Sequence, residues 1–203
     1  MSNYISTVVR DIPPSGIRKF FDLVTQTEGV ISLGVGEPDF VTPWHIREAC
    51  FYSLEKGYTM YTSNLGLLEL REEIAAYEKR KIGVSYSPEN EILVTVGVSE
   101  GIDLALRTLI EPGDEVLVPE PSYVSYAPGA RLAYGKAVPL LTYDADEYRL
   151  RPDILEKAIT PRSKLLVLPY PTNPTGGIMK HDDIKALVEI IIKNDLLVLS
   201  DEI

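Results

Sequence analysis

The sequence predicts an α/β fold, a three-layer α/β/α arrangement with a mostly parallel sheet. Two observations support this prediction. Apolar runs alternate with helical stretches from about residue 92 onward, and strands and helices that alternate at this spacing form parallel βαβ units. The apolar runs also lack a regular alternation of apolar and polar residues, as expected for strands buried on both faces of a sheet. An N-terminal arm and a helix are expected to precede this region.

The N-terminal arm is predicted from its polar composition. It covers residues 1 to about 15 and ends in the breaker cluster Pro13-Pro14-Ser15-Gly16. A helix is then expected over residues 17–27, a short strand over 30–33 and a loop over 34–40.

Two further helices are expected before the alternating region. Thr42 is the expected N-cap of the first, which Pro43 opens and which extends to about Lys56. The second is a long amphipathic helix over residues 67–81, which Gly83 is expected to end.

Five strands and four helices are expected in the alternating region. The strands cover residues 92–96, 115–118, 137–141, 165–168 and 196–199. The helices cover residues 99–110, 123–133, 152–159 and 181–193. In an open α/β sheet, ligands bind in the crevice outside the carboxyl ends of the strands. Residues that follow these strands are therefore the candidates for a functional site.

The composition argues against several classes of protein. The chain is 45% apolar and 25% charged, which is ordinary for a soluble globular protein. Its net charge of −10 argues against a nucleic-acid partner, because binding to the phosphate backbone needs a basic face. Cys50 is the single cysteine, so no internal disulfide forms and a reducing compartment is expected. Without a signal-peptide pattern or a membrane-spanning apolar run, we expect a cytoplasmic protein with no membrane partner.

Common phosphate, metal and hydrolase motifs are not matched. Gly34-Val35-Gly36 begins like a dinucleotide-binding fingerprint, but Asp39 stands where the third glycine is required. The stretch 129–136 has one residue too many for a Walker loop. Neither His45 nor His181 has a metal-ligand neighbour at a useful spacing, so no metal site is expected. The chain also has no Gly-x-Ser-x-Gly elbow of the hydrolase type.

Four side chains follow expected strands and could meet at one edge of the sheet. Ser99 begins a helix directly after a glycine turn, where backbone N–H groups and the helix dipole favour an anion. Tyr123 and Asn173 lie in proline-rich turns that follow the next strands, and Asp201 follows the last. Three of them have a plain structural interpretation as well: Ser99 as an N-cap, Tyr123 as a structural tyrosine and Asn173 as part of a Pro/Gly turn.

Six motifs in the chain resemble, in their order, those of class I/II aminotransferases, which are fold-type-I pyridoxal-phosphate enzymes. The resemblance covers about residues 31–203 and is closest to aspartate-, aromatic- or alanine-type members from bacteria and archaea. The motifs are Leu33-Gly34-Val35-Gly36-Glu37-Pro38-Asp39-Phe40, Tyr61-Thr62, Gly97-Val98-Ser99-Glu100-Gly101, Pro121-Ser122-Tyr123, Asn173-Pro174-Thr175-Gly176 and Ser200-Asp201-Glu202.

The resemblance implies pyridoxal 5′-phosphate as cofactor and a role for each residue of the site. Val98 and Ser99 would bind the cofactor phosphate. Tyr123 would stack on the pyridine ring, and Asn173 would hydrogen-bond the phenolic oxygen. Asp201 would pair with the pyridine nitrogen and keep it protonated, so that the ring can act as an electron sink.

The resemblance also implies residues that bind the substrate and a partner subunit. Gly36 would lie against the substrate carboxylate, and Tyr123 and Asn173 would contact the substrate as well. Tyr61 would reach the cofactor phosphate of the partner subunit, so a homodimer with a shared active site is expected. The substrates would be an amino acid and a 2-oxo acid.

The chain is expected to be the first portion of a longer enzyme. Residues 1–42 would form the N-terminal arm and a small-domain segment, and residues 43–203 the first, truncated part of the large cofactor-binding domain. The Schiff-base lysine of the family is expected further along, so the chain alone should be inactive. Two alternatives stay open: another enzyme of this fold (a β-lyase, decarboxylase or synthase), and an aminotransferase-like sensor domain without activity.

Overall fold

Four parallel strands form one sheet in the computed structural model, in the order β2-β1-β3-β4. The structure describes residues 4–14, 29, 31, 36 and 38–202. The strands are β1 (Glu115–Glu120), β2 (Lys136–Leu141), β3 (Ser163–Leu168) and β4 (Leu197–Ser200). Every pairing is parallel, which confirms the predicted fold class.

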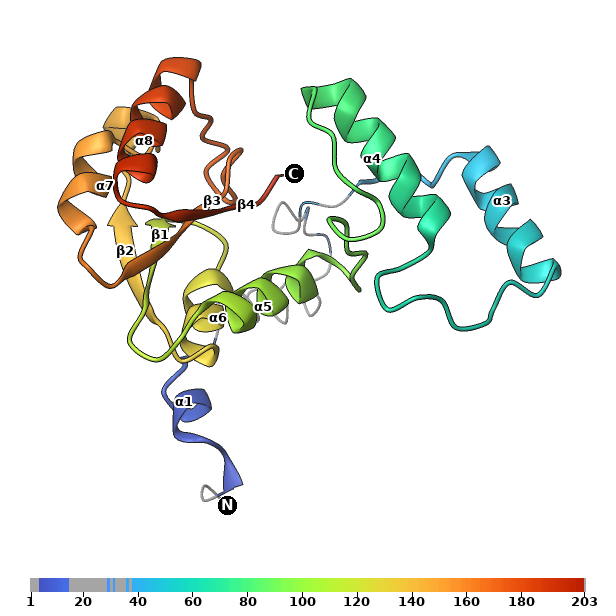
Figure 1. Ribbon diagram of the computed structural model, residues 1–203, viewed down its shortest axis with the longest axis horizontal. Coiled ribbons are helices and arrows are strands. Elements are labelled where there is room, and N and C mark those ends of the chain that lie inside the picture. Colours follow the sequence, from blue (N-terminus) through green and yellow to red (C-terminus); the bar gives the residue numbers. More distant parts are fainter. Residues whose placement is uncertain (1–3, 15–28, 30, 32–35, 37, 203) are drawn as a thin grey trace. The chain divides into compact units, whose positions relative to one another are not determined.

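Helices cover both faces of this sheet (Figure 1). On one face lie α5 (Val98–Leu109) and α6 (Tyr126–Leu132), and on the other lie α7 (Pro152–Ala158) and α8 (His181–Lys193). One turn of helix, α1 (Thr7–Arg10), contacts α6, and the 3-10 turn η2 (Asp144–Asp146) follows β2. The three layers, helix on sheet on helix, are those predicted from the sequence.

Successive residues of the two central strands pack into different cores. In β1, Val116 and Val118 pack against α5 and α6, whereas Leu117 packs against α7 and α8. In β3, Val167 packs on the side of α5 and α6, whereas Leu166 packs on the side of α7 and α8. Because side chains alternate between the faces of a strand, two apolar cores require apolar residues at every position. This is why these strands show no polar alternation in the sequence.

The predicted strand over residues 92–96 is wrong. Within the described structure these residues are in neither a helix nor a strand, and they are not part of the sheet. Val94 donates its backbone N–H to the carbonyl of Leu65 at 3.0 Å. An apolar run becomes a strand only where a neighbouring strand pairs with it, and the run at 92–96 pairs with none of the four strands.

The contacts divide the chain into two units, each described here by itself. Residues 1–14 and 98–203 form the sheet unit, and residues 15–97 form the α3–α4 unit. The predicted division into residues 1–42 and 43–203 stays a prediction.

Two helices of the α3–α4 unit match the prediction closely. They are α3 (Trp44–Glu55) and α4 (Leu68–Ile82), and Gly83 ends α4 in a left-handed conformation. The expected N-cap of α3 is wrong by one residue, because Pro43 occupies the cap position and makes no side-chain hydrogen bond there. The expected helix at 17–27, and most of the strand and loop expected at 30–40, lie outside the described residues. No described helix is long and apolar enough to cross a membrane.

Candidate active site

The end of β4 directs Asp201 toward the α5 and α6 face of the sheet. Leu199 packs against the cluster on that face. Since side chains two residues apart along a strand point to the same side, the side chain of Asp201 follows Leu199. The backbone N–H of Asp201 donates to the carbonyl of Leu168 at 3.3 Å, which ties this residue to the carboxyl end of β3.

A cavity of about 350 Å³ lies at this edge of the sheet unit. Ligand pockets for small molecules commonly span roughly 300–1,000 Å³, so the cavity is large enough for a cofactor. All five of the cofactor residues predicted in this unit line the cavity, and their roles stay predictions. The lining residues are Val98, Ser99, Ile102, Tyr123, Tyr126, Pro169, Pro171, Asn173, Asp201 and Glu202.

The start of α5 contributes Val98 and Ser99 to the cavity. Gly97, immediately before the helix, has a φ of +80°, a conformation that favours glycine. Ile102 is buried against the sheet and fixes this end of α5. The first backbone N–H groups of a helix lack acceptors within the helix, and they attract anions. These positions were predicted from a preceding strand at 92–96, which the described structure does not contain, but the two residues still line the cavity.

Asn173 is held by a compact turn that follows β3. The backbone N–H of Thr172 donates to the carbonyl of Gly177 at 2.9 Å, and the N–H of Gly176 donates to the carbonyl of Thr172 at 2.7 Å. Gly176 adopts a φ of +70°, which an L side chain rarely takes. These bonds close the loop around Asn173. Among the described residues, neither the Asn173 amide nor the Ser99 hydroxyl hydrogen-bonds another protein group.

Two tyrosines form an aromatic pair beside the cavity. The rings of Tyr123 and Tyr126 are 5.5 Å apart between centroids and inclined at 82°, an edge-to-face contact. Tyr126 is 3% exposed, and its ring belongs to the core between α5, α6 and the sheet. Tyr126 is therefore a core residue that also lines the cavity.

The hydroxyl of Tyr126 donates a hydrogen bond to Oδ2 of Asp201 at 2.5 Å. Burial, and then this hydrogen bond, raises the pKa of the Tyr126 hydroxyl, so the tyrosine stays the donor. Sequence reasoning missed Tyr126. A signal was present, because Tyr126 follows Tyr123 by three residues, and residues at this spacing share a face of a helix. However, α6 begins only at Tyr126, not at Tyr123 as expected.

The other lining residues that the sequence did not single out are Ile102, Pro169, Pro171 and Glu202. The two prolines precede Asn173 in the same proline-rich turn, and Glu202 belongs to the motif Ser200-Asp201-Glu202. Ile102 lies one turn of helix after Ser99, again a spacing that shares a helix face. In each case, the residue could have been found because it lies close in the sequence to a residue already predicted to be in the site.

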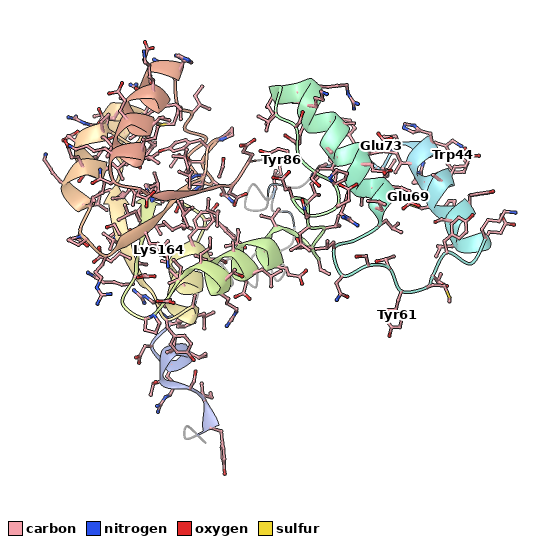
Figure 2. The ribbon with its side chains drawn as sticks, viewed as in Figure 1. Trp44, Tyr61, Glu69, Glu73, Tyr86 and Lys164 are labelled. Atoms are coloured by element: carbon pink, nitrogen blue, oxygen red, sulfur yellow. The ribbon has the colours of Figure 1, made fainter. Side chains whose placement is uncertain are left out.

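Gly36 and Tyr61 belong to the α3–α4 unit, and their roles stay predictions. Tyr61 is fully exposed, and Figure 2 shows its side chain protruding from the connection between α3 and α4. Gly36 is exposed too, and a Cβ at this position would have no atom within 4 Å.

Comparison with known proteins agrees with the site geometry. Residues 28–203 match the family described as aminotransferase class I and II. The chain is 45% identical over 192 residues to aromatic-amino-acid aminotransferase 2 of Thermococcus litoralis, covering 95% of this chain and 49% of that protein. It is 43% identical over 192 residues to an aspartate aminotransferase of Pyrococcus abyssi, with the same coverage.

A solved structure gives the same result. Aspartate aminotransferase from Thermus thermophilus with maleate superposes with a TM-score of 0.91 and 36% identity, over 98% of this chain and 53% of that one. The chain thus spans about half the length of the curated relatives it matches. The family match extends over most of the chain and includes every residue of the cavity. The chain therefore belongs to the aminotransferase class I and II family.

Proposed function

We propose that the whole protein that contains this chain transfers an amino group from an amino acid to a 2-oxo acid with bound pyridoxal 5′-phosphate. One observation carries this proposal. A carboxylate, an amide, an aromatic ring and the start of a helix gather around one cavity at the carboxyl edge of a parallel sheet. The names of the relatives, aromatic-amino-acid and aspartate aminotransferases, support the same reaction.

The cavity has the chemistry that a phosphorylated pyridine ring requires. Its apolar walls include Ile102, Pro169 and Pro171, which suit a flat ring. Its polar groups are a carboxylate, an amide and a hydroxyl beside a helix start. Asn173 and Ser99 have no protein hydrogen-bond partners among the described residues, so both can bind a ligand without breaking a bond.

The start of α5 would hold the phosphate group. The backbone N–H groups near Val98 and Ser99 would donate to the phosphate oxygens, and the Ser99 hydroxyl would add a further donor. Tyr123 would cover one face of the ring, because its own ring lies at the cavity wall.

Asn173 and Asp201 would orient the ring by its polar atoms. The Asn173 amide would donate to the phenolic oxygen, and Asp201 would accept the proton of the pyridine nitrogen. When bound, the protonated ring withdraws electrons from the substrate's α-carbon. Asp201 would keep that proton in place, because a carboxylate close to a cation favours the charged form.

We also infer that the lysine that binds the cofactor covalently is not one of the lysines of this chain. Among the described residues that line the cavity there is no lysine. The chain alone would then bind the cofactor without covalent attachment and would not transfer amino groups.

The α3–α4 unit would supply the remaining contacts. Gly36 would lie against the substrate carboxylate, and its lack of a side chain leaves the backbone accessible. Tyr61 would reach the cofactor phosphate of a partner subunit in a homodimer, and its full exposure suits such a contact.

An assay of the whole protein separates this function from a lyase or decarboxylase on the same fold. We expect the wild-type protein to convert 2-oxoglutarate to glutamate with aspartate or an aromatic amino acid as donor. Asp201→Ala should lower this activity on the order of 100-fold or more. Asp182→Ala is the matched control, because Asp182 is exposed at the start of α8 on the other face of the sheet. Release of ammonia or carbon dioxide without glutamate would contradict the proposal.

A further inference from the structure

The hydrogen bond between Tyr126 and Asp201 joins two residues that are 75 positions apart in the sequence. Among the described residues, Tyr126 supplies the one side-chain hydrogen bond that Asp201 receives. Asp201 lies just beyond the last residue of β4, and its backbone is held to β3 by the hydrogen bond to the carbonyl of Leu168. A single donor therefore determines the orientation of this carboxylate.

The donor itself is held rigidly. Tyr126 is the first residue of α6 and is 3% exposed, with its ring packed in the core beside Ile102 and Val167. The edge-to-face contact with Tyr123 fixes the ring from the cavity side. A rigid donor can hold a carboxylate that would otherwise rotate about two side-chain bonds.

We propose that Tyr126 is a positioning residue for Asp201, whose Oδ2 it binds so that the other carboxylate oxygen accepts from the ring nitrogen of the cofactor. This inference rests on the proposed function. The two carboxylate oxygens then have different partners, one from the protein and one from the ligand. Because the pKa of the Tyr126 hydroxyl is raised, the tyrosine remains a donor through the neutral range and never competes as an anion.

The test uses the whole protein and pyridoxamine 5′-phosphate, which has no aldehyde and so cannot react with a lysine. Tyr126→Phe keeps the ring in the core and removes only the hydroxyl. A hydrogen bond to a charged group corresponds to a change in affinity of about tenfold to a hundredfold. We expect Tyr126→Phe to weaken binding of pyridoxamine phosphate within this range, measured by calorimetry.

The second probe is the analogue in which a C–H group replaces the ring nitrogen. If Tyr126 acts through Asp201 on that nitrogen, Tyr126→Phe should leave the affinity for the analogue within about twofold of wild type. A purely structural role would weaken binding of both probes equally. In an Asp201→Ala background, Tyr126→Phe should have no further effect on either probe.

Tyr170→Phe is the matched control. Tyr170 also donates its hydroxyl to a protein acceptor, the carbonyl of Tyr148 at 3.1 Å, but it packs against the cluster of α7 and α8. The Tyr170→Phe variant should bind both probes with the same affinity as the wild type. If the wild-type protein binds neither probe, the proposed function fails and this inference fails with it. If it binds pyridoxamine phosphate and Tyr126→Phe binds it equally well, only the inference is overturned.

Discussion

Glu115 should stabilise the sheet from the edge opposite to the cavity. It is the first residue of the central strand β1 and is 6% exposed. In the strand register it lies between Lys136 of β2 and Ser163 of β3. The carboxylate accepts hydrogen bonds from Lys136 Nζ at 2.9 Å, Thr160 Oγ1 at 2.6 Å and Ser163 Oγ at 3.1 Å. The carboxylate therefore links β1 to β2 through Lys136 and to β3 through Ser163, and Thr160 adds a contact from the connection before β3.

The magnitude of this effect follows from the partners. The side chain of Lys136 is 69% exposed, so its ion pair with Glu115 contributes about 0–1 kcal/mol. The hydroxyls of Thr160 and Ser163 bind a buried charge, where each hydrogen bond contributes about 1.5–3 kcal/mol before the cost of burying the carboxylate. Glu115→Gln keeps one acceptor oxygen but loses the charge, so we expect a loss of about 1–2 kcal/mol in the free energy of unfolding. Glu115→Ala should lose about 2–4 kcal/mol.

The contribution of Glu115 should depend on pH in a defined direction. The Thr160 hydroxyl, then Lys136, holds the pKa of Glu115 below its ordinary value of 4.5. A carboxyl group with a lowered pKa in the folded state stabilises the protein above that ordinary value and loses this effect as the pH falls through the folded pKa. The difference between wild type and Glu115→Gln should therefore be constant between about pH 5 and pH 7 and shrink at lower pH.

Urea unfolding of the whole protein, followed at several pH values, measures this difference. Glu189→Gln is the control, because Glu189 is exposed on α8. Binding of pyridoxamine phosphate under native conditions should be unchanged in Glu115→Gln, since Glu115 does not line the cavity. Equal stability of Glu115→Gln and wild type at neutral pH would refute this reasoning. So would a difference that grows as the pH falls.

Two further substitutions test the packing of α6 and the phosphate site. Gly135→Ala should destabilise the protein by about 1–3 kcal/mol, because a Cβ there would lie 2.5 Å from Cγ2 of Ile110 and 3.3 Å from the carbonyl oxygens of Ala130 and Asp114; a thermal unfolding midpoint equal to wild type would contradict this. Ser99→Ala should weaken binding of pyridoxamine phosphate by about tenfold, since it removes one charge-assisted hydrogen bond, while binding of unphosphorylated pyridoxamine should not change. An equal loss for both ligands would show that Ser99 does not contact the phosphate.

The strands at 115–118, 137–141, 165–168 and 196–199 could be predicted because each is a run of apolar residues, the pattern of a parallel strand buried on both faces. Of the four strands, β1 and β3 are the ones with several buried residues. The observed strands begin and end within two residues of these ranges. The run at 92–96 has the same composition but forms no strand in the described structure. Hydrophobic composition shows that a segment can be buried. Whether a neighbour pairs with it is a property of the fold, which the segment alone does not contain.

The site was predictable to the extent that it depends on strand ends. Asn173 and Asp201 follow β3 and β4, and the carboxyl ends of neighbouring parallel strands must meet. Tyr126 could not be found in this way, because its contact with Asp201 depends on where α6 lies across the sheet. The position of α6 is determined by its packing against β2, α5 and β1, not by any local pattern.

The sequence alone did not determine to which face of the sheet the side chain of Asp201 points. In the run Ser200-Asp201-Glu202, adjacent residues point to opposite sides of the sheet. Leu199 packs against the cluster of α5 and α6, so Asp201 shares that side, and Ser200 instead lines a separate cavity with Ile184 of α8. An alternating strand would have revealed its buried face from the sequence. Because this strand is apolar throughout, only the packing of Leu199 determines that the acid, and not the serine, faces Tyr126 and the cofactor cavity.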